Sequence, residues 1–320
     1  MREVTEQTRE RWAQDFAERA AAWWTPERTR AQLGTKRLVL PPATSGPLLR
    51  ALGLLNRDAS MPPDRVRKYL QISHMIALLE PVFVDLARHP VVRVLDAGCG
   101  ASYLTLLLGW CFAHRWRHPA QIVGVDRNPE VIERCRRSAS MALLDGVVRF
   151  EVGSLEGLEV PSIWERAFGD ATGGLHALVA LHACDTASDD ALALGVAEGA
   201  DFIGVAPCCQ AELARRWAEL SERGMPGPLA PLWASSHLRR EAGATLTNAL
   251  RALLLRARGY DVTAMEFVPT AHTPKNTLLR AVLGGTGGLE EYLALRDALG
   301  GVSLHLERAL RARHCYVPGL

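Results

Sequence analysis

Apolar positions along the chain follow two patterns that meet near residue 90. Before that point they recur at helical spacing: residues 1–33 are expected to be helical, and a further helix is expected after the prolines at 62 and 63. His89 precedes Pro90 and ends this helix, because a residue before proline is disfavoured in the helical conformation. The pattern therefore predicts a helical N-terminal extension over residues 1–90.

Beyond residue 90, short apolar runs of strand length alternate with helix-length segments. The strand candidates, in chain order, are VVRVLDAG, QIVGVD, VVRFEVG, HALVALHACD and DFIGVAPCC. This alternation is typical of βαβ units and a parallel sheet. Two later runs, at 260–268 and 276–285, are separated by a loop too short for a helical crossover, so we expect an antiparallel hairpin.

These elements predict an α/β fold with a doubly wound, Rossmann-like sheet of five parallel strands followed by the hairpin. The sheet domain is expected over residues 91–285, and residues 286–320 are expected to form a closing helical segment. Five parallel strands followed by such a hairpin are the pattern of class I methyltransferases, whereas most dinucleotide dehydrogenases lack the hairpin.

The amino-acid composition indicates the class of protein and the compartment in which we expect it. Hydrophobic residues make up 48% and charged residues 22% of the 320 residues, which is typical of a globular chain. No uninterrupted apolar run reaches the ~20 residues that span a bilayer, and the N-terminus lacks the apolar core of a secretory signal, so we expect a cytoplasmic protein without a membrane partner. The seven cysteines are irregularly spaced, which indicates reduced thiols. A net charge of +2 leaves the partner open.

The segment DAGCG at 96–100 ends a predicted buried strand and opens onto a helix, a position where cofactors bind. The dinucleotide fingerprint GxGxxG fails here, because Tyr103 stands where its last glycine is expected. The carboxylate of Asp96 would repel a pyrophosphate but attract the ammonium and sulfonium of S-adenosyl-L-methionine. We therefore expect that cofactor, bound at Asp96, Gly98 and Gly100, with Tyr103 beside them.

The ends of the next strands offer further cofactor contacts. Asp126 ends the second strand and is expected to accept hydrogen bonds from both ribose hydroxyls, with Arg127 near the adenine. Ser154 and Leu155 follow the third strand, where a contact to the adenine amino group is expected, and Leu181 ends the apolar part of the fourth. The alternative is that these are ordinary residues of turns at the sheet edge, which for Ser154 is an equally good interpretation.

Polar residues crowd after strands four and five, where a doubly wound sheet places the reacting part of its ligands. His182 and Asp185 are candidate general bases or orienting groups, because methyl transfer needs little beyond alignment and deprotonation of the acceptor. His272 and Lys275 lie in the hairpin loop and are expected to approach the same face. The alternatives are helix capping for Asp185 and simple solvation for His272 and Lys275.

The cysteines after these strands suggest two other chemistries. HAC at 182–184 and PCC at 207–209 superficially resemble a zinc deaminase signature, but position 184 holds no glutamate and adjacent cysteines cannot reproduce the CxxC spacing. We therefore expect no obligate metal. Cys208 is also a candidate nucleophile for a cytosine-5 methyltransferase, although strand four lacks the proline-cysteine of those enzymes. Inert buried thiols are a third interpretation.

The segments LDAGCGASYLT, LHACDTASDDAL and VAPCCQ together resemble a methyltransferase superfamily that includes eukaryotic tRNA 2′-O-methyltransferases and bacterial relatives. The resemblance covers roughly residues 65–285 and implies a class I S-adenosylmethionine-dependent methyltransferase. It also implies that Arg67, Lys68 and Gln71 lie in a segment that covers the cofactor or substrate. Gln210 departs from the histidine of the tRNA enzymes, and residues 1–60 contain no zinc-finger-like array of cysteines and histidines.

The predicted function is methyl transfer from S-adenosylmethionine to RNA, at a 2′-oxygen or a base, by a deprotonated acceptor. The alternatives are methylation of a small molecule or a protein, cytosine-5 methylation through Cys208, and a non-catalytic scaffold that binds S-adenosylmethionine or RNA. The near-neutral charge and the absence of a dense basic patch with interleaved aromatics favour the first of these alternatives. His237, Arg239 and Arg240 are further candidates on the substrate side, and the sequence indicates no oligomeric state.

Overall fold

The computed structural model describes residues 6–35, 38–181, 186–207, 211–224, 226–227, 229–267 and 276–315. The chain forms two compact units. The N-terminal unit runs to Gly153 and includes Pro161–Ala171, and the C-terminal unit comprises Ser154–Val160 and the chain from Thr172 onward. The predicted helical extension over residues 1–90 is thus packed with the first strands in one unit.

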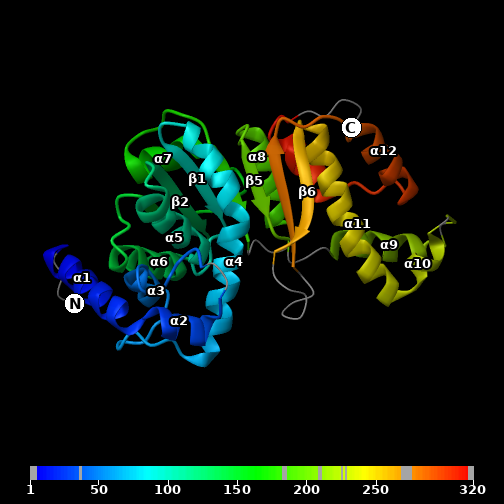
Figure 1. The fold of residues 1–320 in the computed structure, drawn as a ribbon. Helices are drawn as coiled ribbons and strands as arrows, with labels where there is room; N and C mark the ends of the chain where they lie inside the picture. The colour runs from blue at the N-terminus through cyan, green and yellow to red at the C-terminus, as the bar shows by residue number, and fades with distance from the viewer. Residues whose placement is uncertain are drawn as a thin grey trace. The chain divides into compact units, whose positions relative to one another are not determined.

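The N-terminal unit contains three strands and a set of helices (Figure 1). The strands are β1 (Val92–Ala97), β2 (Ala120–Asp126) and β3 (Val148–Val152), which pair in parallel in the order β3-β2-β1. The helices are α1 (Glu6–Trp23), α2 (Pro26–Leu33), α3 (Gly46–Ala51), α4 (Pro63–Asp85), η1 (Leu86–Arg88), α5 (Tyr103–Trp110), η2 (Cys111–Trp116), α6 (Pro129–Met141) and all but the first residue of α7 (Val160–Phe168).

Local sequence explains where these elements begin. All six residues of β1 are buried, as expected of a strand covered on both faces in a parallel sheet. Helix α2 begins at Pro26, and the side chain of Thr25 caps it by accepting a hydrogen bond from the backbone N–H of Arg28 at 3.2 Å. Helix α6 begins after Asn128, whose side chain accepts from two backbone N–H groups of the first turn.

Gly109 allows α5 to pack closely against β3. A Cβ atom at this position would lie 2.3 Å from Cγ2 of Val148, a branched side chain that cannot swing away. We expect Gly109→Ala to lower the free energy of unfolding by about 1–3 kcal/mol despite the higher helix propensity of alanine. Chemical denaturation measures the change, and a variant as stable as the wild type would contradict this packing.

Helix α4 is extended by η1 to Arg88, and by length and composition alone this segment could cross a membrane. Its Tyr69, Ile76, Leu79 and Phe83 are at most 1% exposed inside the protein. This burial accounts for the apolar composition without a membrane.

The C-terminal unit contains the remaining strands. They are β4 (Ala177–Ala180), β5 (Phe202–Val205), β6 (Tyr260–Glu266) and β7 (Thr277–Leu283), in the order β4-β5-β7-β6. β4 and β5 are parallel, whereas β7 is antiparallel to both β5 and β6. The predicted hairpin is confirmed, and so is the doubly wound α/β class, because the strand orders of the two units are the halves of the series 3-2-1-4-5-7-6.

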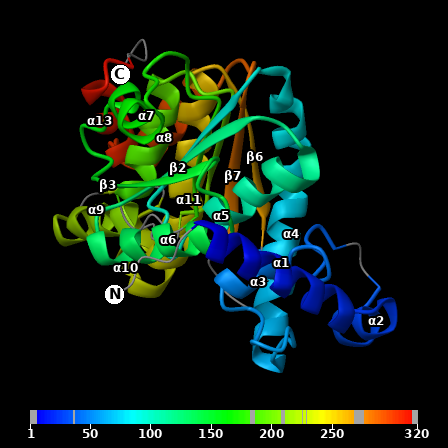
Figure 2. The ribbon, with the colours of Figure 1, turned by 90° about the vertical axis from the view of Figure 1, so that its left-hand side faces the viewer.

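Helices cover this part of the sheet (Figure 2). They are α8 (Ala187–Ala197), α9 (Ala211–Glu222), α10 (Ala230–Ala234), α11 (Ser236–Ala257), α12 (Leu289–Ala298) and α13 (His305–Ala312). The long α11 packs against α9, β6 and α12, and α13 packs against α8. The last two helices, α12 and α13, lie in the segment 286–320.

Candidate active site

The glycine turn after β1 adopts a backbone conformation that favours glycine. Gly98 and Gly100 have φ angles of +73° and +50°, and the backbone N–H groups of Gly98 and Cys99 both donate to the carbonyl of Val125 at 2.9 Å. A Cβ atom at Gly100 would meet no atom within 4 Å. Two hydrogen bonds to Val125 therefore hold the turn, and the space where a Cβ of Gly100 would lie is open to a ligand.

Asp126 joins the end of β2 to this turn. Its Oδ2 accepts the backbone N–H of Gly100 at 3.1 Å, and its Oδ1 accepts the N–H of Asn128 at 2.9 Å. The next residue, Arg127, is exposed. The structure thus brings Gly98, Gly100 and Asp126 together as predicted, with a fixed carboxylate beside an open turn, an arrangement that fits a ribose and its hydroxyls. The ribose contact itself stays a prediction.

Asp96 lies inside the protein rather than on the open side of the turn. Its side chain is almost fully buried, and its Oδ2 accepts a hydrogen bond from the hydroxyl of Thr105 at 2.6 Å. Burial raises the pKa of Asp96 to about 6, the hydrogen bonds from Thr105 partly oppose this, and the charge of Asp126 adds to it. A cation near the turn would restore the ionised form, which fits the ammonium and sulfonium groups expected there.

Tyr103, predicted to contact the cofactor, lies at the first position of α5. Its hydroxyl donates to the carbonyl of Leu52 at 3.3 Å, and the ammonium of Lys68 lies 3.7 Å from the centre of its ring. The ring lines a cavity of about 220 Å³ together with Cys135 and Ser138. Lys68, which the resemblance placed in a covering segment, therefore packs on Tyr103, and the cofactor contact of Tyr103 stays a prediction.

Two thiols pack against each other near the turn. Cys99 and Cys135 are both buried, and Sγ of Cys135 donates to the carbonyl of Gly100 at 3.2 Å. The hydrogen bond with Cys135, burial and the nearby Asp96 raise the pKa of Cys99 far above neutral. Cys99 is consequently a neutral thiol that fills the space beneath the turn.

The remaining predicted cofactor residues belong to the C-terminal unit. Ser154 is exposed, Leu155 is buried with its carbonyl accepting from the guanidinium of Arg313 at 2.7 Å, and Leu181 is 8% exposed. Their contacts with a cofactor stay predictions. The five predicted catalytic residues lie outside the described residues: His182, Asp185, Cys208, His272 and Lys275.

The segments holding those five residues start from one edge of the C-terminal sheet. β4 and β5 are parallel, and β6 runs in the same direction because both it and β5 are antiparallel to β7. Leu181 directly follows β4, and residues 268–275 connect β6 to β7. The described ends of β4, β5 and β6 therefore lie at the same edge of this sheet, whereas the placement of the predicted catalytic residues stays a prediction.

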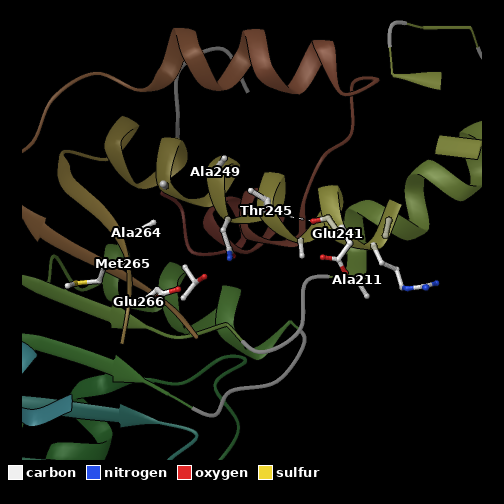
Figure 3. Close-up of a pocket in the computed structure, with 13 residues that line it drawn as sticks. Ala211, Glu241, Thr245, Ala249, Ala264, Met265 and Glu266 are labelled. Atoms are coloured by element: carbon white, nitrogen blue, oxygen red, sulfur yellow. Dashed lines mark hydrogen bonds between the residues drawn. The ribbon is translucent and has the colours of Figure 1, made fainter. Parts of the chain in front are cut away.

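A pocket of about 750 Å³ opens at this edge, between α11 and the end of β6 (Figure 3). Ala211, Glu266 and Thr277 line it, and these residues border the segments 208–210 and 268–275 in the chain. Its wall is rich in small residues, namely Ala211, Ala214, Ala244, Ala249, Ala252 and Ala264. Because alanine occupies so little volume, the space between α11 and the hairpin is left open.

Six of the thirteen described residues that line the pocket are polar or charged. Its charged lining residues are Arg240, Glu241 and Glu266, and its uncharged polar ones are Thr245, Asn248 and Thr277. Arg240, one of the candidates on the substrate side, thus lines the pocket. Arg239 instead donates to the backbone carbonyl of Trp233.

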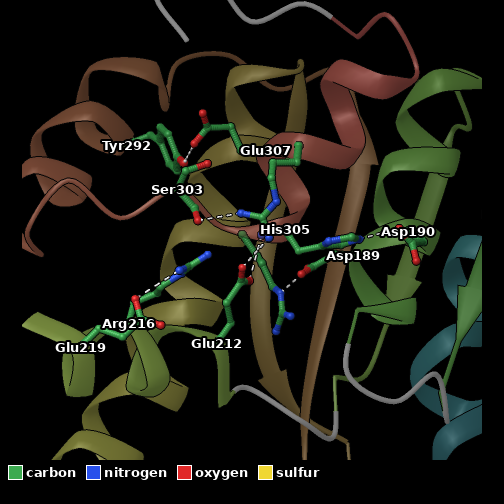
Figure 4. A network of polar contacts seen from close by, with 11 residues as sticks. Asp189, Asp190, Glu212, Arg216, Glu219, Tyr292, Ser303, His305 and Glu307 are labelled. Carbon is green, nitrogen blue, oxygen red and sulfur yellow. Dashed lines mark hydrogen bonds and ion pairs between the residues drawn. The ribbon is translucent and has the colours of Figure 1, made fainter.

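A polar network holds the helices next to the pocket (Figure 4). The backbone N–H of His305 and the guanidinium of Arg308 donate to the carboxylate of Glu212 on α9, at 2.9 Å and 2.7 Å. The imidazole of His305 lies 2.8 Å from Oδ1 of Asp190 on α8. One residue of α13 therefore joins the beginnings of α8 and α9, the two helices that follow the segments 182–185 and 208–210.

No metal centre is found among the described residues, where no group of three or more histidine, cysteine or acidic residues is placed to bind an ion. Apart from Pro207, the residues of the deaminase-like pattern after β4 and β5 lie outside the described ranges. The expected absence of an obligate metal stays a prediction.

Comparison with solved structures gives distant similarities. The SAH-bound Podospora anserina methyltransferase PaMTH1 is 15% identical, with 88% of this chain and 98% of that chain covered at a TM-score of 0.43. Geranyl diphosphate methyltransferase in complex with GPP and sinefungin is 14% identical, with 95% of this chain and 96% of that chain covered at a TM-score of 0.38. The uncharacterized Listeria monocytogenes protein LMOf2365_1472 is 11% identical, with 63% of this chain and 66% of that chain covered at a TM-score of 0.33.

The sequence comparisons identify the class of enzyme. No curated protein sequence matches the chain. Residues 67–216 match the family model Methyltransf_32, described as a methyltransferase domain. This segment contains the open glycine turn, the buried Asp96 and the fixed carboxylate of Asp126, and the protein is an S-adenosylmethionine-dependent methyltransferase.

Proposed function

We propose that the protein methylates a small molecule or a protein side chain that binds in the pocket between α11 and β6. The lining of this pocket supports the proposal most directly. It combines a wall of alanines with two carboxylates, Glu241 and Glu266, and one guanidinium, Arg240. Such a surface suits a compact acceptor with an apolar body.

The same lining is a poor surface for RNA. Proteins that bind single-stranded RNA combine a positively charged groove with aromatic side chains on which bases stack. Of the described residues that line the pocket, none is aromatic, and the acidic side chains outnumber the basic one. A phosphate backbone would be repelled by Glu241 and Glu266.

Methyl transfer requires residues that hold the methyl donor and a residue that accepts a proton from the acceptor. S-adenosylmethionine supplies a methyl group bonded to a positively charged sulfur, and the turn at Gly98 and Gly100 with Asp126 would hold it. Bound there, it would supply the methyl carbon to an acceptor oxygen or nitrogen, and its sulfur would keep the electron pair of the broken carbon–sulfur bond. His182 or Asp185, on the segment that follows β4, takes the proton of the acceptor. Alignment of the two reactants supplies most of the remaining rate enhancement.

Incubation with methyl-labelled S-adenosylmethionine tests the acceptor class. Purified protein is combined with fractionated cell lysate, with and without ribonuclease, and label is followed in the nucleic acid, protein and small-molecule fractions. We expect ribonuclease-resistant label in the protein or small-molecule fraction. Label that ribonuclease removes would refute the proposal.

RNA is the second candidate, because LHACDTASDDAL and VAPCCQ resemble the tRNA 2′-O-methyltransferases. If the label is found in RNA, Cys208→Ser separates the two RNA chemistries. A cytosine-5 methyltransferase that uses Cys208 loses turnover and its covalent adduct with 5-fluorocytosine RNA, whereas a 2′-O-methyltransferase keeps partial activity.

Asp126→Ala tests the cofactor site independently of the acceptor. Hydrogen bonds to a charged group contribute about 1.5–3 kcal/mol, so loss of the ribose contacts should weaken S-adenosylhomocysteine binding by about 10- to 100-fold. Isothermal titration calorimetry measures the dissociation constant, with Asp64→Ala as a control because that side chain is 72% exposed at the start of α4. Equal affinity of Asp126→Ala and wild type would exclude a ribose contact at Asp126.

A further inference from the structure

We propose that Asn248 determines the specificity of the pocket between α11 and β6, by donating a hydrogen bond to a carbonyl oxygen of an uncharged acceptor molecule. This inference rests on the proposed function, because it treats the pocket as the acceptor site. The chemical class is an aliphatic amide, ester or ketone.

The orientation of the Asn248 amide is fixed by Arg251, one turn later on α11. Nη1 of Arg251 lies 3.1 Å from Oδ1 of Asn248. A guanidinium contains only hydrogen-bond donors, so the amide must turn its oxygen toward Arg251 and its NH₂ group away. No described residue accepts a hydrogen bond from that NH₂ group, and Asn248 lines the pocket. The pocket therefore presents a donor at this position.

Arg251 is itself held rigidly. Its Nε lies 2.6 Å from Oδ1 of Asp189, and the two side chains are only 3% and 2% exposed. Asp189 belongs to the first turn of α8, which follows the segment 182–185 (Figure 4). A paired guanidinium in such a buried position cannot rotate to release Asn248. The donor is thus preorganised, which lowers the entropic cost of binding a ligand.

The surrounding charges select against anionic ligands. Among the lining residues that the structure describes, Glu241 and Glu266 outnumber Arg240, which disfavours an anion although it could accept a hydrogen bond from Asn248. An ammonium group cannot form a hydrogen bond with the NH₂ group of Asn248, because both groups are donors. Ala244, Ala249 and Met265 supply apolar surface for an aliphatic chain. A neutral carbonyl compound satisfies all three features.

Three probes of equal chain length test this assignment: hexanamide, hexanoate and hexylammonium. Saturation-transfer NMR titrations give their dissociation constants for the full-length protein. The wild type should bind hexanamide most tightly. Asn248→Asp should weaken hexanamide about tenfold, because one hydrogen bond is lost, and should strengthen hexylammonium.

Asn248→Asp keeps an oxygen for Arg251, so its melting temperature should stay close to that of the wild type. Asn56→Asp, the same change outside the pocket lining, should leave all three affinities unchanged. If Asn248→Asp fails to fold, Asn248→Ala replaces it, and hexanamide should weaken without any gain for hexylammonium.

Unchanged probe affinities in these variants, or no hexanamide binding by the wild type, would overturn the assignment of Asn248. These outcomes are independent of the labelling experiment. Ribonuclease-resistant label with no hexanamide binding would refute the role of Asn248 but keep the proposed function, whereas ribonuclease-sensitive label would refute the proposed function itself.

Discussion

Replacing Arg251 with methionine is expected to lower the free energy of unfolding by about 3–5 kcal/mol, because it leaves a buried carboxylate without its partner. The carboxylate of Asp189 is 2% exposed, and burial already raises its pKa, which the charge of Arg251 opposes. Asn248 would also lose the donor that orients its amide. Urea denaturation measures the change in stability.

Two further variants show whether the lost charge pairing is the cause. Arg216→Met breaks an ion pair with Glu219 whose side chains are 48% and 49% exposed, and such surface pairs contribute about 0–1 kcal/mol. Asp189→Asn combined with Arg251→Met removes the unpaired charge, so the double variant should be more stable than Arg251→Met alone. A cost for Arg251→Met no larger than that for Arg216→Met would contradict the buried pair.

Asp96→Asn is expected to stabilise the cofactor-free protein near neutral pH and to weaken its binding of S-adenosylmethionine. The pKa of Asp96 is about 6 in the folded protein, against an ordinary value of 3.8. Since one pKa unit corresponds to about 1.4 kcal/mol, ionising this buried carboxyl above pH 6 costs the folded state about 3 kcal/mol. Well below pH 3.8 it is protonated in both the folded and the unfolded state, and the cost vanishes.

Stability therefore falls between about pH 4 and pH 6 in the wild type through this one group, and asparagine removes that fall. Denaturation at pH 4.5 and pH 7.5 should show a clearly larger gain for Asp96→Asn at the higher pH. Asp15→Asn, at an exposed position of α1, is the control. An equal effect of Asp96→Asn at both values would disprove the raised pKa.

Much of the fold follows from local patterns in the sequence. The apolar runs that become β1 and β5 are buried along their whole length, which requires cover on both faces and hence a parallel sheet. The loop at 268–275 is too short for a crossover and enforces the hairpin. Thr25 starts α2 because its side chain can accept a backbone N–H before a proline.

The contacts that set the properties of the site were not predictable, because they join distant positions. Asp96 was expected at the turn, but the structure buries its carboxylate against the hydroxyl of Thr105. The only sign of this partner in the sequence is that Thr105 is a single hydroxyl residue within an apolar helix. Asp189 and Arg251 are 62 residues apart, and nothing in the sequence distinguishes Arg251 from the other arginines. Likewise, the alanines of α11 look like ordinary helix residues until the hairpin faces them.

A crystal structure of the protein with S-adenosylhomocysteine tests the central assignment most directly. We expect the adenosine at the turn formed by Gly98 and Gly100, with the ribose hydroxyls within hydrogen-bond distance of the Asp126 carboxylate. A complex in which the ligand lies elsewhere, or in which its ribose makes no contact with Asp126, would contradict the assignment of the cofactor site.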